Sequence, residues 1–378
     1  MKRYIIVDIA LLLILIKVIW VSLAMNGYEN TETEKDDIFK RRDWLLDKVS
    51  VPPGDLLNMM PHSIGLQFQG EWALYSCSML TQALANIAFI YPETKDESIN
   101  NIDSLISIVL SPELRQYDTV RWGEDPLKTL KGNNSHISYI SHLAWMIGNY
   151  KSLGGGAKYD TLYHDLCKTM NRRIMQSPNL NLPTYPDEPI YIPDMLVAIV
   201  ALHKNGNYNS TVKEWLKRAK AEWIDEETGL LMSFLYNDAP VKGSYTALNC
   251  YYLTLIDEHF AREQYALMRR YFYRGGLLPG IKEYATRSPL FEEDIDAGVI
   301  LFGLSPSATA FAIGSATFFS DDATRIALLR TAEIVGHTVK KDNKRHYLLA
   351  DIVLVGEAIA LAMRTNYPTN TEHQNKSF

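Results

Sequence analysis

Cysteine is scarce in this sequence, and its few copies lie far apart. The 378 residues include three cysteines, Cys77, Cys167 and Cys250. No pair has the Cys-x-x-Cys spacing of a zinc or redox motif, so no metal site is predicted from them. Because the number is odd, a disulfide framework is not expected either.

Several other signatures are missing. Lysine and arginine are scattered and the net charge is −6, so the chain lacks the basic stripe of a nucleic-acid-binding protein. No Gly-x-Ser-x-Gly elbow, Walker loop or Rossmann glycine pattern occurs in a convincing strand–helix setting. Nucleic acid is therefore not an expected partner, and no nucleotide-binding motif is present.

The N-terminus combines positive charge with a long apolar run. Lys2 and Arg3 precede an apolar stretch from Tyr4 to Met25, which only Asp8 and Lys17 interrupt. About 20 helical residues cross a bilayer core of roughly 30 Å. Positive flanks stay in the cytoplasm. We therefore expect a membrane anchor, with the globular domain on the extracytoplasmic (periplasmic) side.

A cleaved signal peptide is the alternative for residues 1–25. Ser22 and Ala24 are small residues at the spacing that signal peptidase recognises, so cleavage after Ala24 would give a secreted protein. The apolar stretch is longer than the core of about 7–15 residues usual in signal peptides. This length favours a retained anchor.

The rest of the chain divides into three predicted regions. Residues 26–50 are predicted to be a polar linker, because their first part is acidic and lacks periodicity. Residues 51–365 carry apolar stripes at helical spacing, separated by proline and glycine breakers. Residues 366–378 are polar and are predicted to form a disordered tail.

The stripes within residues 51–365 predict about eleven helices. They cover Trp72–Tyr91, Ile102–Leu110, Ile137–Tyr150, Tyr159–Met175, Met195–His203, Thr211–Trp223, Ala247–Ile256, Arg262–Tyr273, Ser307–Phe319, Asp322–Val339 and Tyr347–Met363. We predict an all-α chain whose body is an (α/α)6 toroid of helical hairpins, preceded by one N-terminal transmembrane or signal helix. An open α-solenoid is the alternative, but no repeat of fixed period is visible.

The loop before the fifth stripe carries the first candidate site residues. They are Tyr185, Asp187, Glu188, Tyr191 and Asp194. Asp194 directly precedes the stripe, so it could instead be the helix N-cap, worth about 1 kcal/mol. In that alternative, Asp187 and Glu188 are solvated loop charges.

A second acidic segment, Phe291–Gly298, precedes another apolar run. It holds four carboxylates within five positions, including Asp294 and Asp296. Crowded carboxylates repel one another, so some must be solvated, bind a cation or have raised pKa values. The two aspartates could form an acid–base pair, and an acidic helix start is the alternative. The spacing is not that of an EF-hand loop, so no metal ion is predicted.

Two helical stripes supply further polar candidates. His142 lies six residues after His136, so the two histidines face different sides of a helix and do not share a metal. A single helical histidine is more often structural than catalytic. Tyr245 and Asn249 are four residues apart and share one helix face, which could line a pocket.

Six short segments follow one another in a recognisable order. They are Tyr75-Ser…Ile90-Tyr91-Pro92, Gly123-Glu-Asp-Pro126, Ile137-Ser-Tyr-Ile-Ser-His142-Leu143, Pro186-Asp187 with Asp194, Val241-Lys242…Tyr245-Thr246 and Asp294-Ile-Asp296-Ala-Gly298. Together, from about Tyr75 to Asp321, they resemble the linalool dehydratase/isomerase family. The resemblance implies an exported (α/α)6 barrel, no cofactor, a homo-oligomeric ring, and elimination of water from an allylic alcohol followed by rehydration.

The resemblance also implies roles for single residues. His142 would be the acid–base group, Asp187 or Asp294 its partner, and Tyr245 an orienting hydroxyl. The sequence departs from the family at two loop cysteines, because Thr184 and Pro193 occupy their positions and neither is a thiol acid or base. We predict a cofactor-independent lyase or isomerase acting on a small alcohol in the central cavity.

Two alternatives remain open. A carbohydrate-active hydrolase or epimerase would use the loop carboxylates as catalysts and the aromatic rings for sugar stacking. A non-enzymatic envelope scaffold would keep the fold for binding or assembly. For either enzyme, the residues predicted to contact the small-molecule substrate are Trp122, Tyr185, Glu188, Tyr191, Asp194, Asn249 and Asp296.

Overall fold

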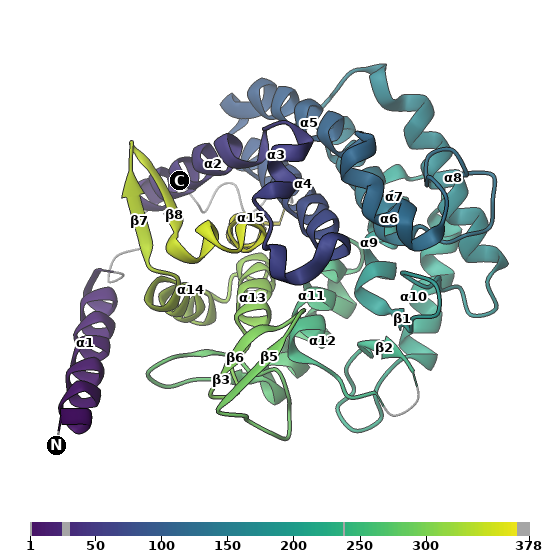
Figure 1. The fold of residues 1–378 in the computed structure, drawn as a ribbon. Coiled ribbons are helices and arrows are strands. Elements are labelled where there is room, and N and C mark those ends of the chain that lie inside the picture. Colours follow the sequence, from purple (N-terminus) through teal and green to yellow (C-terminus); the bar gives the residue numbers. More distant parts are fainter. Residues whose placement is uncertain (1, 25–30, 237–238, 369–378) are drawn as a thin grey trace.

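The computed structural model describes residues 2–24, 31–236 and 239–368. This part of the chain is mostly helical (Figure 1). Its strands are short and form two-stranded antiparallel pairs. The all-α prediction is confirmed at this level.

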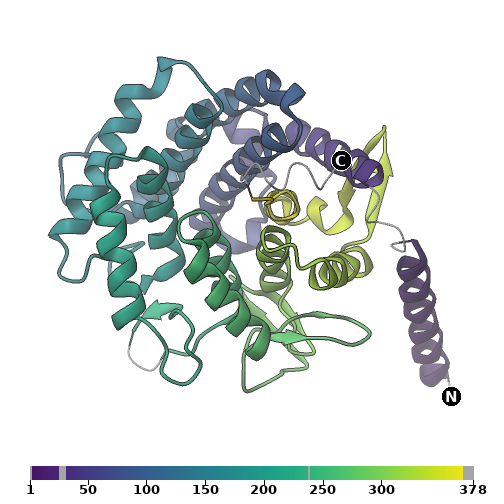
Figure 2. The same ribbon diagram turned by 180° about the vertical axis from the view of Figure 1, so that it is seen from behind.

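Six buried helices contact one another in cyclic order. We call them the inner helices: α4 (Gly65–Ile90), α7 (Ile137–Ser152), α9 (Ile192–Asn205), α11 (Gly243–Thr254), α13 (Pro306–Phe318) and α15 (Leu354–Arg364). Each packs on the next in this order, and α15 packs on α4 (Figure 2). In α11 every residue is buried. A helix enclosed on all sides belongs to the interior of the molecule.

A second set of helices covers the inner helices from outside. They are α2 (Thr31–Val49) on α15 and α4, α5 (Lys95–Val109) on α4, α8 (Asp160–Gln176) on α7, α10 (Asn209–Glu222) on α9, α12 (Glu258–Tyr271) on α11 and α14 (Asp322–Gly336) on α13. These helices are amphipathic: α12, for instance, buries Phe260, Gln264 and Met268 and exposes its charged face.

Shorter elements connect the helices. The helical ones are α3 (Pro53–Asn58), α6 (Pro112–Trp122), η1 (His62–Ile64), η2 (Pro92–Thr94), η3 (Ala157–Tyr159) and η4 (Leu348–Asp351). The strand pairs are β1 (Ile190–Tyr191) with β2 (Phe234–Leu235), β3 (Tyr273–Arg274) with β4 (Gly280–Ile281), β5 (Phe291–Asp294) with β6 (Gly298–Leu301), and β7 (Thr338–Lys341) with β8 (Lys344–Tyr347). The acidic segment Phe291–Gly298, for which a helix start was the alternative, thus forms strand β5 and the turn into β6.

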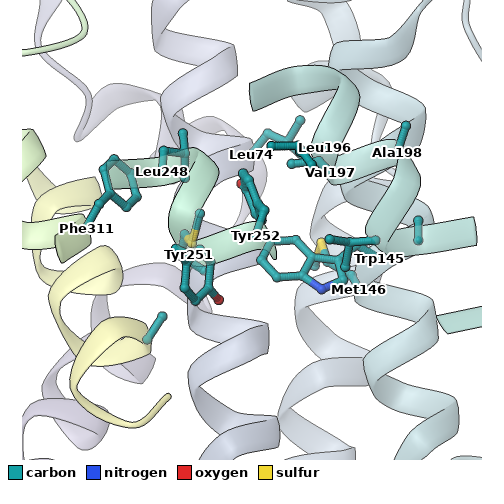
Figure 3. Packing of buried hydrophobic residues seen from close by; sticks show 14 of the residues in the cluster. Leu74, Trp145, Met146, Leu196, Val197, Ala198, Leu248, Tyr251, Tyr252 and Phe311 are labelled. Atoms are coloured by element: carbon teal, nitrogen blue, oxygen red, sulfur yellow. The ribbon is translucent and has the colours of Figure 1, made fainter. Parts of the chain in front are cut away.

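Large side chains fill the space between the inner helices. Figure 3 shows Trp145 of α7 beside Tyr252 of α11, and their ring centroids lie 5.7 Å apart in an edge-to-face arrangement. Leu74 and Phe311 pack in the same cluster, and all four side chains are buried. Any site formed by these helices must therefore lie toward one of their ends.

The predicted polar linker is wrong for residues 31–49, which form helix α2. Ile38, Leu45 and Val49 are buried in the core. Asp37 and Arg41 are buried as well, because they pair with each other and with charged groups of the C-terminal part. In the sequence, charged residues whose partners are distant cannot be distinguished from the charged residues of a polar linker. Residues 26–30 of the predicted linker lie outside the described residues.

The predicted disordered tail is wrong at its start. Asn366 is buried, and its side-chain amide donates hydrogen bonds to Thr254 Oγ1 at 3.2 Å and to the Gly314 carbonyl at 3.1 Å. These bonds fix the chain end against α11 and α13. Residues 369–378 lie outside the described part of the chain.

The N-terminal helix α1 (Lys2–Ala24) stands beside the body and contacts α14 (Figures 1 and 2). Among the described residues, one helical stretch is long and apolar enough to cross a membrane, Gln67–Ile90 of α4. It is 83% buried inside the protein, so it is a core helix. Within α1, the described apolar stretch Leu12–Val21 is shorter than that criterion requires.

Candidate functional site

The first turns of three inner helices bring polar side chains together. Ser138, Asp194 and Tyr245 lie in the first turns of α7, α9 and α11. Helix N-termini carry partial positive charge and so favour carboxylates nearby. Glu71 and Tyr75 of α4 face this group, because Tyr75 Oη donates a hydrogen bond to Asp194 Oδ1 at 3.3 Å.

Glu71 is the only charged residue of α4, and its environment keeps it protonated. Burial and the negative charges of Asp194 and Asp296 together raise its pKa to about 8, although Arg121 and the Tyr185 hydroxyl oppose the shift. Protein atoms surround the side chain, yet part of it remains accessible to solvent. At neutral pH this partly accessible carboxyl therefore holds a transferable proton.

Close packing brings α4 next to α6 at this point. A Cβ on Gly70 would lie 2.6 Å from Tyr117 Cβ, so only glycine permits this approach. This close approach of the two helices places Glu71 near the C-terminal end of α6, where Arg121 lies. The Arg121 guanidinium stacks 3.7 Å from the Tyr185 ring centroid and pairs with Glu188 at 3.1 Å.

Asp194 is the second carboxylate of the site. Burial raises its pKa to about 6, while hydrogen bonds from Thr184 and Tyr75 hold it lower than burial alone would. Thr184 Oγ1 donates to Asp194 Oδ2 at 2.6 Å. At neutral pH Asp194 is therefore mostly ionised while Glu71 is protonated. The alternative N-cap role is wrong, because Tyr191 holds the cap position of α9.

A cluster of hydroxyl groups lies behind Glu71. Ser138 Oγ lies 3.1 Å from both the Tyr117 and the Tyr185 hydroxyl oxygens. All three side chains are buried. The Tyr185 hydroxyl also interacts with the Glu71 carboxyl. The hydrogen bond that joins Ser138 to Tyr185 therefore fixes the position of the Tyr185 hydroxyl beside Glu71.

The opposite side of the site is formed by aromatic rings and the β5–β6 hairpin. Tyr191 and Tyr245 lie edge-to-face with centroids 6.1 Å apart. Asp296 interacts with the Tyr245 hydroxyl, and Lys242 Nζ lies 3.8 Å from its carboxylate. Many protein atoms enclose Asp296, which raises its pKa, but 39% of its side chain is exposed. Asp296 therefore contacts water at the edge of the group of carboxylates.

His142 lies one layer behind the carboxylates. Its ring centroid is 4.3 Å from that of Tyr75, and its Nδ1 is 2.9 Å from Ser78 Oγ. Burial lowers its pKa to about 3, so the ring is neutral at physiological pH. A side chain in this position supports Tyr75 and does not face the carboxylates.

The predicted partners of His142 are wrong. Asp187 is exposed in its loop, with a left-handed φ of 61°. Asp294 accepts hydrogen bonds from the Asp296 and Ala297 amides, both at 2.9 Å, and pairs with Lys242 Nζ at 2.6 Å. Lys242 and the amides lower the pKa of Asp294 although burial opposes them. Asp294 is thus a turn residue that holds the hairpin in place.

Two further predicted residues lie outside the carboxylate group. The Trp122 ring packs against His136, with centroids 5.3 Å apart. His136 Nδ1 is 2.6 Å from Asp118 Oδ2. Asn249 is buried, and its amide donates to the Met232 carbonyl at 3.4 Å. The predicted residues that the structure does bring together are Tyr185, Glu188, Tyr191, Asp194, Tyr245 and Asp296.

Sequence reasoning missed Glu71, Arg121 and the role of Tyr75. A usable signal was present for one of them, since Glu71 is the single charge in 26 residues of an otherwise uncharged helix. Burying an ionised carboxylate costs free energy unless it is paired or takes up a proton. A single carboxylate in an apolar helix is therefore a candidate site residue. Arg121 gave no such signal, because α6 is an ordinary polar helix.

Two surface recesses elsewhere do not coincide with this site. The larger, of about 480 Å³, lies between α10 and α12 and is lined by Lys220, Phe260 and Leu267 among others. It lacks a paired acid and base, so we place the candidate site at Glu71 and Asp194. In the described ranges, no three His, Cys, Asp or Glu side chains converge as a metal site would require.

No protein-family model matches this chain, and comparison with the curated proteins gives no match either. The resemblance to the linalool dehydratase/isomerase family therefore stays a prediction.

Proposed function

We propose that the chain is an acid–base enzyme of the hydro-lyase or isomerase class that acts on a small hydroxylated substrate. The proposal depends on one observation: two neighbouring carboxyl groups have different pKa values, about 8 for Glu71 and about 6 for Asp194. Two neighbouring titratable groups whose pKa values are shifted apart by their environments are typical of a catalytic acid and base. For the fold we propose the (α/α)6 toroid, which the cyclic contacts of the inner helices and their outer partners support.

The reaction needs one proton donor and one acceptor. Glu71 donates its proton to the substrate hydroxyl, the C–O bond breaks, and water leaves. Asp194 removes a proton from the neighbouring carbon, and the C–H electron pair becomes the new double bond. Proton return from Asp194 to Glu71 through water restores the starting state. Rehydration at a different carbon gives the isomer.

The substitution of the family cysteines fits this assignment. Thr184 stands at one cysteine position and donates its hydroxyl hydrogen to Asp194. The acid–base function that the resemblance gives to thiols and to His142 thus passes to Asp194 and Glu71. Tyr75 and Tyr245 then orient the substrate, while His142 positions Tyr75.

A carbohydrate-active enzyme is the second candidate. The observation that favours it is the wall formed by Arg121, Tyr185 and Glu188, where a charged pair lies against an aromatic ring. Sugar sites combine aromatic faces with ionic hydrogen-bond partners, and the same acid could protonate a glycosidic oxygen. The third reading, a non-enzymatic scaffold, predicts no turnover of either substrate class.

We further propose that α1 anchors the protein in a membrane, with the body on the extracytoplasmic side. Its length of about 35 Å exceeds a bilayer core. Its described surface exposes large apolar side chains: Ile9, Leu12, Leu13, Ile14, Leu15, Ile16, Ile19, Trp20 and Leu23. Such a surface requires an apolar cover, and Lys2 and Arg3 at its start place that end in the cytoplasm.

The test is turnover of two substrate panels by the purified full chain. One panel holds allylic and other small alcohols, and the other holds aryl glycosides, with products identified by gas chromatography and mass spectrometry. We expect dehydration or isomerisation of an alcohol, and a loss of about 10²–10⁴-fold for Glu71→Gln and Asp194→Asn. Glu226→Gln, which changes an exposed loop carboxylate, is the matched control and should keep full activity.

Three outcomes would contradict the proposal. Glycoside cleavage without alcohol turnover favours the second candidate. Full activity of Glu71→Gln removes the proposed acid. A larger loss for His142→Gln than for Glu71→Gln would return the central role to the histidine.

A further inference from the structure

The outward face of the β5–β6 hairpin is apolar, which reverses the usual pattern. Phe291 pairs with Leu301, and Glu293 pairs with Val299, so these four side chains share one face. On a hairpin with one face buried, the solvent face is normally polar. Here Glu293 is the one charged residue on that face, and Phe291, Leu301 and Val299 are 60%, 45% and 45% exposed.

Neighbouring residues extend this surface. Leu290 and Phe302 flank the strands and are 69% and 58% exposed. We call the five residues Leu290, Phe291, Val299, Leu301 and Phe302 the hairpin face. Exposed large apolar side chains gathered within 13 residues mark a surface that another apolar phase covers.

The inner face of the same hairpin is held against the body of the protein. Asp294 pairs with Lys242, and Ile300 is fully buried. Glu292 pairs with Arg287. The hairpin is therefore held firmly from within, and its apolar outer face is a fixed surface of the folded body.

The position of this face relative to α1 indicates what covers it. The helix α1 contacts α14, and Thr331 of α14 donates a hydrogen bond to the Pro279 carbonyl at 2.5 Å, in the turn between β3 and β4. In Figures 1 and 2, α1 runs beside the lower half of the body and the hairpin lies at its lower edge. The six residues between α1 and α2 can span at most about 20 Å, so an anchored α1 keeps the body against the bilayer.

We propose that the hairpin face docks on the surface of the lipid bilayer that holds α1. The proposal rests on the membrane anchor proposed above. Apolar side chains of such surface elements enter the boundary between headgroups and acyl chains, to a depth of about 5–10 Å. Arg274, whose guanidinium donates to the Phe302 carbonyl at the edge of the face, lies where an anionic headgroup would be. The body thus contacts the membrane at two points.

A site-directed spin label can test this in the full chain. Single cysteines replace Phe302 on the hairpin face, Leu13 on α1 and Met175 on α8, as Phe302→Cys, Leu13→Cys and Met175→Cys. The native cysteines are fully buried and do not compete for label. Each labelled protein is reconstituted in phosphatidylcholine–phosphatidylglycerol vesicles, and the accessibility of the nitroxide to oxygen and to a water-soluble nickel chelate is measured.

We expect an oxygen-to-nickel accessibility ratio several-fold higher at Phe302 than at Met175, with Leu13 higher still. A ratio at Phe302 equal to that at Met175, with Leu13 in lipid, overturns the docking but leaves the anchor intact. Nickel-accessible labels at both Leu13 and Phe302 overturn the anchor and the docking together. Spin–spin broadening at Phe302 with low accessibility to both reagents assigns the face to a second copy of the chain, which also overturns the proposal.

Discussion

Two buried groups of charges in this protein have opposite electrostatic balance. At the contact of α2 with the C-terminal part, Asp37 pairs with Arg41 and with Arg364, and Arg41 also pairs with Glu357 at 2.7 Å. At the candidate site, Glu71 and Asp194 face each other and Asp296. We call these the balanced network and the carboxylate site.

The pKa values of the two groups diverge although both are deeply enclosed. Burial disfavours the ionised form of Asp37, but Arg41 and Arg364 outweigh it and hold its pKa far below the usual value. Burial disfavours ionised Glu71 too, and neighbouring carboxylates add to it. Burial alone therefore does not distinguish a structural carboxylate from a functional one. Buried charge that is neutralised holds elements together, whereas buried charge of one sign stores a proton.

The largest expected effect comes from breaking the balanced network. Arg41→Met leaves the buried Glu357 without its arginine partner, whereas Asp37 keeps Arg364. We expect a loss of about 3–5 kcal/mol in the free energy of unfolding, because an uncompensated buried charge remains. Denaturant unfolding followed by circular dichroism measures this.

Lys40→Met is the matched control for that experiment. Lys40 is the neighbouring residue, and it pairs with Asp36 at the surface, where ion pairs contribute about 0–1 kcal/mol. Equal losses for the two variants would contradict the distinction between the balanced network and ordinary surface pairs.

The second expected effect is that the two groups of charges change the free energy of unfolding with pH in opposite directions. Asp37 has a lowered folded-state pKa, so its contribution to stability is present above its unfolded pKa of about 4 and is lost as the pH falls. Glu71 has a raised pKa of about 8 against the usual 4.5. The folded state then binds the extra proton, so stability declines as the pH rises from about 4.5 to about 8.

Glu71→Gln should remove the part of that decline that comes from Glu71 and extends to about pH 8, and should leave the acid limb unchanged. The raised pKa of Asp194, about 6, keeps a decline at lower pH. We expect the variant to exceed the wild type by on the order of 1–3 kcal/mol at pH 8, less than the full pKa difference implies because the side chain is partly accessible to water. Unfolding free energies at a series of pH values give the answer. A Glu71→Gln curve parallel to the wild-type curve would mean that Glu71 is ionised like a surface carboxylate.

The smallest expected effect is on the pKa of Asp194 in the carboxylate site. Thr184→Val removes the hydroxyl that donates to Asp194 Oδ2. We expect the pKa of Asp194 to rise from about 6 by about one unit. Carboxyl ¹³C chemical shifts followed over pH measure this change. Thr184→Ser keeps the donor and should keep the pKa, and the same rise in both variants would attribute the change to packing.

The sequence predicted the helices well where their packing is amphipathic. The stripe Tyr159–Met175 corresponds to α8 and Thr211–Trp223 to α10, because an outer helix must show one apolar side. It failed at α2, where the buried face includes Asp37 and Arg41. Local pattern cannot identify a charged residue as buried when its partners lie some 300 positions away.

The candidate site was predicted in part. The proline-rich loop drew attention to Asp194, and the acidic hairpin segment to Asp296, and the structure brings both to the same group of side chains. Asp187 and Asp294 were indistinguishable from them by composition, yet one is solvated and the other closes a turn. Sequence position gives the residue type but not the direction of the side chain.

By itself, the sequence determined that the chain is helical, that it begins with an apolar segment, and that carboxylates and tyrosines accumulate between its helices. These properties follow from periodicity and composition, which act over a few residues. Only the tertiary structure decided which carboxylates meet, because the pKa of Glu71 depends on Asp194 and Asp296, more than 100 positions away. Electrostatic coupling depends on distance in space and on the water that folding removes.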